Sequence, residues 1–229
     1  MDSLARVTEE VVGCRACPRL VAWRELVAKE KRASFKGEVY WGRPVPGFGD
    51  PAASLLVVGL APAAHGGNHT GRGFTGDRSG DWVYRAMWRA GFANQPTSVS
   101  ADDGLQLTGA WVAAVVRCAP PANKPTPEER DRCVGYLARE LTLLPDVRVV
   151  VALGQFAYDA VCRLFAIRPR PRFGHGVEVE LPGEVEAHRR TLVCSYHPSQ
   201  QNTFTGTLTE PAFDAIFTRA RQLVTAEGL

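Results

Sequence analysis

Four short and nearly continuous apolar runs divide the chain. They lie at Leu55–Leu60, Trp111–Arg117, Val147–Leu153 and Thr191–Tyr196. Runs of this length that are rich in β-branched residues and show little alternation are typical of parallel strands buried on both faces. The pattern therefore predicts a central four-stranded parallel sheet.

Amphipathic segments around and between these runs predict helices on both faces of the sheet. They are Arg19–Lys31, Gly80–Ala90, Pro127–Leu144, Gln155–Phe165 and Glu210–Thr225. The third has a clear start signal, because Thr126 followed by Glu129 has the spacing of a capping box. The alternation of strands and helices predicts an α/β fold, a three-layer α/β/α sandwich with right-handed crossovers.

Three long loops rich in turn residues follow the carboxyl ends of predicted strands. They are Ala61–Gly80, Ala119–Thr126 and His197–Thr209. In an open α/β sheet, ligands bind at this edge. We therefore expect the functional site to be built from the residues that follow the first, second and fourth apolar runs.

Length, composition and charge exclude several classes of protein. A length of 229 residues with 45% hydrophobic content fits a single domain, 1–229, around one core. The net charge of +3 does not by itself indicate a nucleic-acid-binding protein. No apolar run approaches the roughly 20 residues of a membrane span, and the N-terminus does not resemble a signal peptide. We expect a cytoplasmic monomer that does not associate with membranes.

Cysteine spacing predicts a metal site. A C-x2-C pair near the N-terminus and a second pair about 100 residues later supply four sulfurs: Cys14, Cys17, Cys118 and Cys133. Such a site would tie the N-terminal segment to the rest of the domain. Spacing alone leaves both zinc and an iron–sulfur cluster open. The apolar surroundings of Cys162 and Cys194 predict that these two pack in the core.

The loop after the first strand is unusually rich in glycine. From Gly59 to Gly80 it reads GLAPAAHGGNHTGRGFTGDRSG. It matches neither a Walker A loop nor the GxGxxG motif of dinucleotide-binding proteins. Its backbone amides could hold an anion or a ring that carries carbonyl groups. A long surface loop without a ligand is the alternative interpretation.

The other two loops each offer one side chain suited to catalysis. His197 begins the segment HPSQQNT, where a neutral imidazole can donate to a developing negative charge. Asn123 lies in the proline-stiffened segment CAPPANKPTP and could position a water molecule. A structural histidine and an ordinary turn asparagine are the alternatives.

Seven segments together resemble family 5, the UDGb type, of the uracil-DNA glycosylase superfamily. They are CRACPRL from Cys14, RPVPGFGDP from Arg43, GLAPA from Gly59, TGRGFTGD from Thr70, RCAPPANKPTP from Arg117, ALG from Ala152 and SYHPSQQNT from Ser195. The resemblance covers nearly the whole chain. It implies a four-stranded parallel sheet flanked by helices and a [4Fe–4S] cluster on the four cysteines. It also implies hydrolytic removal of uracil and other deaminated bases from double-stranded DNA, the first step of base excision repair.

Two departures from related families bear on specificity. Family 4 has an acidic residue in the loop after the first strand, where this chain reads GLAPA with no polar side chain. Families 1 and 4 read uracil with an asparagine on a strand, where this chain reads VAAVV from Val112. Without that amide we expect less exclusive recognition of uracil, with hypoxanthine or xanthine as further substrates.

The resemblance also implies catalytic roles. We expect His197 to stabilise the charge that grows on the base carbonyl and Asn123 to hold the attacking water. Asp77 is a second catalytic candidate, either as a weak base or as a support for its loop. A carboxylate at a helix N-terminus is an equally good interpretation of Asp77. The cluster would be structural and would hold the loop that carries Asn123.

Binding residues follow from the same resemblance. Phe74 should stack on the base, and backbone amides near Ala61 and Ala63 should bind its polar edges together with His197. Contacts with DNA are expected from Arg72, Lys124, Gln200, Gln201, Asn202 and Thr203. Three competing functions stay open: a non-catalytic zinc module that binds nucleic acid, a relative that binds uracil-containing DNA covalently, and a hydrolase of free nucleotides.

Overall fold

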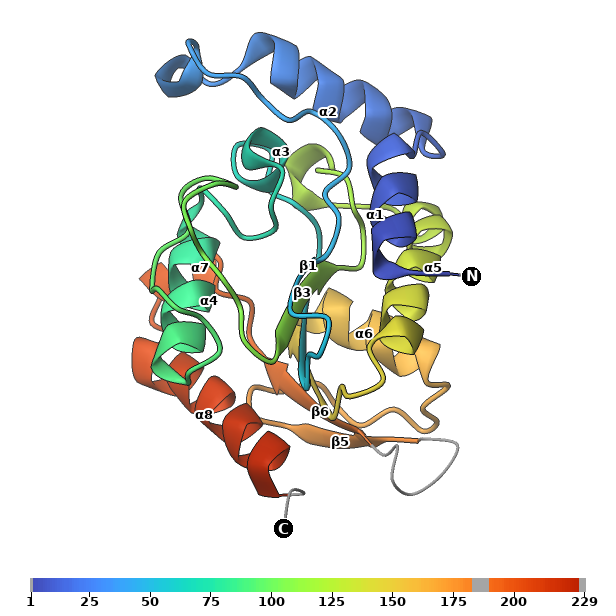
Figure 1. The fold of residues 1–229 in the computed structure, drawn as a ribbon, viewed down its shortest axis with the longest axis vertical. Helices are drawn as coiled ribbons and strands as arrows, with labels where there is room; N and C mark the ends of the chain where they lie inside the picture. The colour runs from blue at the N-terminus through green and yellow to red at the C-terminus, as the bar shows by residue number, and fades with distance from the viewer. Residues whose placement is uncertain (1, 183–189, 227–229) are drawn as a thin grey trace.

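A mixed sheet forms the centre of the computed structural model, which describes residues 2–182 and 190–226 (Figure 1). Within these residues the sheet has six strands in the order β1-β3-β2-β4-β6-β5. Its four central strands are parallel: β3 (Ala110–Ala114), β2 (Leu55–Gly59), β4 (Val149–Leu153) and β6 (Arg190–Ser195). The four predicted strands are confirmed.

Two antiparallel edge strands were not predicted. β1 (Phe48–Gly49) pairs with β3, and β5 (Glu178–Leu181) pairs with β6. β1 is only two residues long, and β5 alternates exposed and buried positions. Neither forms the continuous apolar run that marks a strand covered on both faces.

Helices cover both faces of the sheet, which confirms the three-layer arrangement (Figure 1). On one face, α4 (Arg78–Arg89) and α8 (Glu210–Ala226) pack on Leu55 and Val57. On the other face, α5 (Pro127–Leu143) and α6 (Gln155–Leu164) pack on Leu56 and Val58. Successive residues of β2 thus serve opposite cores, as the pleat of a strand requires.

The predicted helices begin and end within a few residues of the positions expected from the sequence. The capping box of α5 is present, since Glu129 N donates to Thr126 Oγ1 at 3.3 Å and Thr126 N donates to Glu129 Oε2 at 2.8 Å. Cys162 and Cys194 are buried in the core, as predicted. No helix in the described part of the chain is long and apolar enough to cross a membrane.

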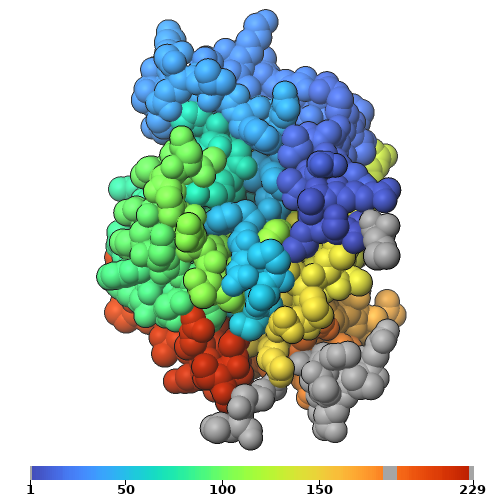
Figure 2. Space-filling view, viewed as in Figure 1, coloured from blue at the N-terminus to red at the C-terminus, as the bar shows by residue number. Residues whose placement is uncertain are grey.

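The N-terminal segment forms two helices, α1 (Leu4–Gly13) and α2 (Pro18–Glu30). Only α2 was predicted. α1 packs on α5 and buries Val7 and Val11, and Arg139 of α5 forms ion pairs with Asp2 and Glu10. Figure 2 shows this segment (dark blue) lying over the body of the molecule. Short helices complete the described part: η1 (Ala33–Phe35), α3 (Gly67–Thr70), η2 (Pro121–Asn123) and α7 (Gln200–Phe204).

Candidate active site

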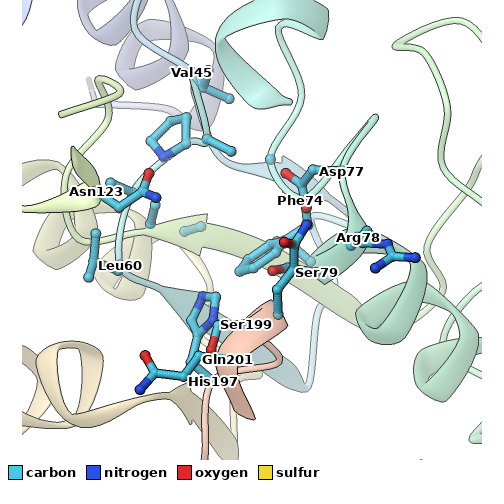
Figure 3. Close-up of a pocket in the computed structure, with 18 of the residues that line it drawn as sticks. Val45, Leu60, Phe74, Asp77, Arg78, Ser79, Asn123, His197, Ser199 and Gln201 are labelled. Atoms are coloured by element: carbon cyan, nitrogen blue, oxygen red, sulfur yellow. The ribbon is translucent and has the colours of Figure 1, made fainter. Parts of the chain in front are cut away.

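A cavity of about 590 Å³ opens at the carboxyl edge of the parallel strands. The three predicted loops supply most of its walls, with Phe74 after β2, Asn123 after β3 and His197 after β6. Figure 3 shows these side chains around one space although they come from distant parts of the chain. The site therefore lies where the topology of an open α/β sheet predicts it.

His197 is partly buried at the floor of this cavity. Burial lowers the pKa of its imidazole to about 4, so the ring is neutral at pH 7. Its backbone carbonyl accepts hydrogen bonds from Ser199 N at 2.7 Å and Asn202 Nδ2 at 2.8 Å. These bonds hold the backbone, while the ring nitrogens bond to no other described residue. The ring can therefore donate to a ligand.

The position of the Phe74 ring depends on two glycines, Gly59 and Gly80. The ring centroid of Phe74 lies 6.3 Å from that of His197, and its backbone has a φ of 52°. A Cβ atom on Gly59 would lie 2.5 Å from Phe74 Cζ. A Cβ atom on Gly80 would overlap the carbonyl oxygen of Phe74. Glycine at both positions therefore lets the ring form a wall of the cavity.

Asp77 caps helix α4 and also lines the cavity. Its Oδ1 accepts a hydrogen bond from Gly80 N at 3.0 Å, which confirms the helix-terminus interpretation. Burial raises the pKa of this carboxyl, and the N–H groups of Gly80 and Ser79 oppose that shift. The carboxyl thus supports the loop that carries Phe74. Its catalytic role stays a prediction.

Asn123 is exposed at the mouth of the cavity, on a tight turn. Ala122 and Asn123 have φ values of 51° and 56°, and Asn123 N donates to Pro120 O at 3.2 Å. Arg19 of α2 also holds this turn, because its Nη2 donates to Lys124 O at 3.1 Å. The amide of Asn123 bonds to no other described residue. It is free to hold a water molecule.

The residues expected to contact DNA divide into two groups. Gln200, Gln201 and Lys124 are exposed, and the two glutamines lie on the rim of the cavity. Asn202 and Thr203 point back into their own loop, since Asn202 Nδ2 donates to His197 O and Thr203 Oγ1 donates to Ser199 O at 3.1 Å. Asn202 therefore helps to hold the backbone of His197 in place.

Arg72 was predicted to contact DNA, and that prediction is wrong. Its guanidinium is buried, with Nη2 2.7 Å from Asp103 Oδ1 and 2.8 Å from Ser98 Oγ. Nε donates to Thr75 Oγ1 at 3.0 Å. With its polar groups occupied inside the protein, Arg72 anchors the glycine-rich loop to the 98–103 segment.

Replacing Arg72 with alanine is expected to lower the free energy of unfolding by about 3–5 kcal/mol, because Asp103 would remain as a buried charge without its partner. Urea titration of both proteins measures this. Arg43→Ala is the matched control. An Arg72→Ala protein that unfolds at the wild-type urea concentration would contradict the assignment.

Two residues beside the cavity, Arg78 and Phe204, were not predicted from the sequence. The guanidinium carbon of Arg78 lies 4.9 Å from the ring centroid of Phe204, which is 69% exposed. Arg78 lines the cavity beside Ser79, whose Oγ donates to Pro198 O at 3.0 Å. The only sequence signal for Phe204 was an aromatic residue inside the polar segment QQNTFTG. This stacked pair adds a cation and an apolar surface next to the cavity.

The four cysteines line a second cavity, between α2 and α5. Arg117 N donates to Cys133 Sγ at 3.2 Å. Burial raises the pKa of the Cys118 thiol and raises that of Cys133 to about 12, so their thiolates require a nearby cation. Among the residues that the structure describes, no three His, Cys, Asp or Glu side chains are arranged to hold a single metal ion.

Two arginine contacts also link the N-terminal segment to α5. Arg19 of α2 pairs with Glu129 of α5, with 2.7 Å between Nη2 and Oε2. Arg132 Nη1 donates to Ala16 O at 3.1 Å, within the C-x2-C turn. Both contacts join the N-terminal segment to α5, the helix that follows the Asn123 loop.

Comparison with known proteins gives consistent matches. A family model described as the uracil DNA glycosylase superfamily matches residues 46–221. The chain is 53% identical over 228 residues to a type-5 uracil-DNA glycosylase of Mycobacterium bovis, covering 98% of this chain and 83% of the relative. It is 51% identical over 224 residues to a type-5 enzyme of Thermus thermophilus, covering 97% and 99%. A type-4 enzyme of Archaeoglobus fulgidus is 28% identical over 204 residues, covering 87% and 83%.

Proposed function

This chain belongs to the type-5 uracil-DNA glycosylases of the uracil DNA glycosylase superfamily, and on that premise we propose that it removes uracil from double-stranded DNA. It is a hydrolase of N-glycosidic bonds whose product is an abasic site, the starting point of base excision repair. The observation that carries the proposal is the cavity that Phe74, Asn123 and His197 share.

Base recognition would use the apolar walls of this cavity. The target base must leave the helical stack before the glycosidic bond can be reached, at a cost of roughly a few kcal/mol. Phe74 would then stack on the ring. The N–H groups of Ala61 and Ala63, which bond to no other described residue, would donate to its polar edges.

Two side chains would have separate roles in cleaving the N-glycosidic bond. The base leaves as an anion from a sugar with oxocarbenium character. Neutral His197 would donate to the base carbonyl oxygen on which charge develops. Asn123 would orient the attacking water, because an amide is too weak a base to deprotonate it. We propose that Asp77 supports this site through its bond to Gly80 N rather than acting as the base.

Specificity would be broad. Val112, Ala113 and Ala114 of β3 line the cavity with apolar side chains. A site without an amide reading the base edge discriminates less against analogues. We therefore propose hypoxanthine and xanthine as further substrates.

Contact with the duplex would come from the rim of the cavity. Gln200 and Gln201 would approach the space that the extruded base leaves, and Lys124 and Arg78 would approach phosphates. We propose that residues 1–229 act as one monomeric domain in the cytoplasm. The absence of disulfide bonds among the six cysteines fits a reducing compartment.

We propose a [4Fe–4S] cluster on Cys14, Cys17, Cys118 and Cys133, which line one cavity. A cubane spreads four thiolates over four separate corners, whereas zinc draws them to one point. The four sulfurs that line this cavity supply the four thiolates that such a cubane needs. When bound, the cluster would supply no chemistry to the hydrolysis. The cysteines would hold the N-terminal helices against the Asn123 loop.

Glycosylase assays on matched duplexes test the function. Purified protein is incubated with labelled duplexes that contain one U·G, U·A, hypoxanthine·T or C·G pair, and alkali then cleaves abasic sites. Cleavage at uracil and at hypoxanthine, with none at C·G, is the expected result. Tight binding without cleavage would favour the zinc-module alternative. An adduct that survives denaturing electrophoresis would favour covalent binding, and hydrolysis of free deoxyuridine monophosphate alone would favour a nucleotide hydrolase.

Replacing Gly59 with alanine is expected to weaken base binding, because the added methyl group would displace the Phe74 ring. Losing one base–aromatic stack costs about 1–3 kcal/mol, so the KM for a U·G duplex should rise about tenfold with a smaller change in kcat. The matched control is Gly37→Ala, because a Cβ atom there meets nothing within 4 Å. An unchanged KM would remove Phe74 from the base site.

Replacing Cys133 with alanine is expected to remove the iron chromophore and to lower stability and activity together, because the Asn123 loop would lose one of its anchors. Visible absorbance, iron content and urea unfolding measure the change. Cys162→Ala serves as the control, since Cys162 is buried away from the cysteine cavity. A Cys133→Ala protein that folds normally with full activity would contradict the structural role.

A further inference from the structure

Arg24 is a buried cation that faces the four-cysteine cavity. Its side chain, on α2, is 2% exposed and lines the same cavity as the four sulfurs. Nη1 donates to Cys118 Sγ at 2.9 Å, and Nη2 donates to Cys14 O at 3.2 Å. Both terminal nitrogens of the guanidinium therefore point toward cysteine residues.

No carboxylate in the described part of the chain forms a hydrogen bond with this guanidinium, and its one ion pair is long and exposed. The nearest is Glu25, 3.9 Å from Nη2, but Glu25 is 44% exposed and forms a bidentate pair with Arg15. Arg117, the other fully buried arginine at this cavity, is paired with buried Glu140. Burying a cation costs several kcal/mol unless an anion lies beside it. The surroundings of Arg24 therefore require an anion, and the cysteine site is the place for it.

We infer that Arg24 is the counter-cation of the metal group held by the four cysteines. Four thiolates outweigh the positive charge of a [4Fe–4S] core, so the bound cluster is an anion. The guanidinium offsets that charge and donates a hydrogen bond to one ligand sulfur. Both effects hold the cluster in place. Both also favour its more reduced, more negative state and so raise its reduction potential.

The backbone of Arg24 is linked through Asn68 to the loop that lines the base cavity. Its carbonyl oxygen accepts from Asn68 Nδ2 at 3.2 Å, and Asn68 is fully buried. Asn68 N donates to Ala63 O at 3.0 Å, in the loop that lines the base cavity. Arg24 is thus a positioning residue that joins the cysteine site to the base-binding loop.

The inference rests on the proposed cluster, and its test uses the whole chain purified without air. Arg24→Gln removes the charge, Arg24→Lys keeps it, and Arg6→Gln makes the same change at an exposed arginine of α1. Iron content, the rate at which visible absorbance is lost to a chelator, and the midpoint potential are measured for each protein.

We expect Arg24→Gln to lose its cluster about tenfold faster than wild type and to have a more negative potential. Arg24→Lys should lie between them, and Arg6→Gln should match wild type. If Arg24→Gln does not fold, a faster loss and a more negative potential in Arg24→Lys still support the inference. Wild-type values in the variants that fold would overturn it. Wild-type protein without iron would instead overturn the proposed cluster, and the inference with it.

Discussion

Replacing Asn123 with alanine is expected to lower kcat on a U·G duplex by about 10³-fold, which corresponds to roughly 4 kcal/mol of transition-state stabilisation. The amide lies at the cavity mouth, and no other described residue occupies its donor and acceptor groups. Without it, the attacking water would have to be ordered during the reaction. KM should change little, because the amide would hold the water and not the base. Single-turnover assays with excess enzyme measure the chemical step directly.

Backbone conformation is the main alternative cause of such a loss. Asn123 has a φ of 56°, a conformation in which alanine is strained and glycine is not. Asn123→Gly therefore removes the amide without straining the turn, and it should be as slow as Asn123→Ala. Near-normal activity of the glycine variant would assign the effect to the turn. Lys124→Ala, on the same loop, should alter only the salt dependence of DNA binding.

Replacing His197 with alanine is expected to lower kcat by about 10²–10³-fold, as for the loss of one donor to a developing anion. His197→Gln should recover part of the rate, because an amide N–H can also donate. A glutamine variant as slow as the alanine variant would contradict a neutral donor. Asn202→Ala, which removes the brace on the His197 carbonyl, should have a smaller effect.

The pH dependence provides a second test of His197. Since burial lowers its pKa to about 4, kcat should show no titration near pH 6.5. A step near pH 6.5 that disappears in His197→Gln would contradict the neutral imidazole. The same shift costs stability as the pH falls from about 6.5 toward 4, because the unfolded chain then binds a proton that the folded chain does not. The urea midpoint of the wild type should therefore fall more over this range than that of His197→Gln.

The cysteine site and the active site meet in the loop between β3 and α5. Cys118 lies in that loop, Asn123 is part of its turn, and Arg19 of α2 donates a hydrogen bond to Lys124 O beside the turn. A structural metal group can therefore affect catalysis without taking part in it. The same argument applies to Asn68, which links Arg24 to the base-binding loop.

The central sheet, the helices on its faces and the loops that line the cavity could all be predicted from the amino-acid sequence. Buried parallel strands need continuous apolar runs, and helix ends need capping groups, so both leave local signals such as Thr126 with Glu129. Residue types also identified the cysteine set and the candidates His197 and Asn123. Each of these signals can be read within a few neighbouring positions.

Which polar side chains are buried became clear only from the folded structure. Arg72 was expected at the DNA and instead pairs with Asp103, while Arg24 gave no signal at all and lies buried against Cys118. Asn202, which was expected to contact DNA, donates a hydrogen bond to the carbonyl oxygen of His197. An arginine is stable inside a protein only where partners distant in sequence meet it. The residues next to a buried arginine in the sequence therefore do not predict its burial. The cost of burying the charge is offset by partners that come together only when the chain folds.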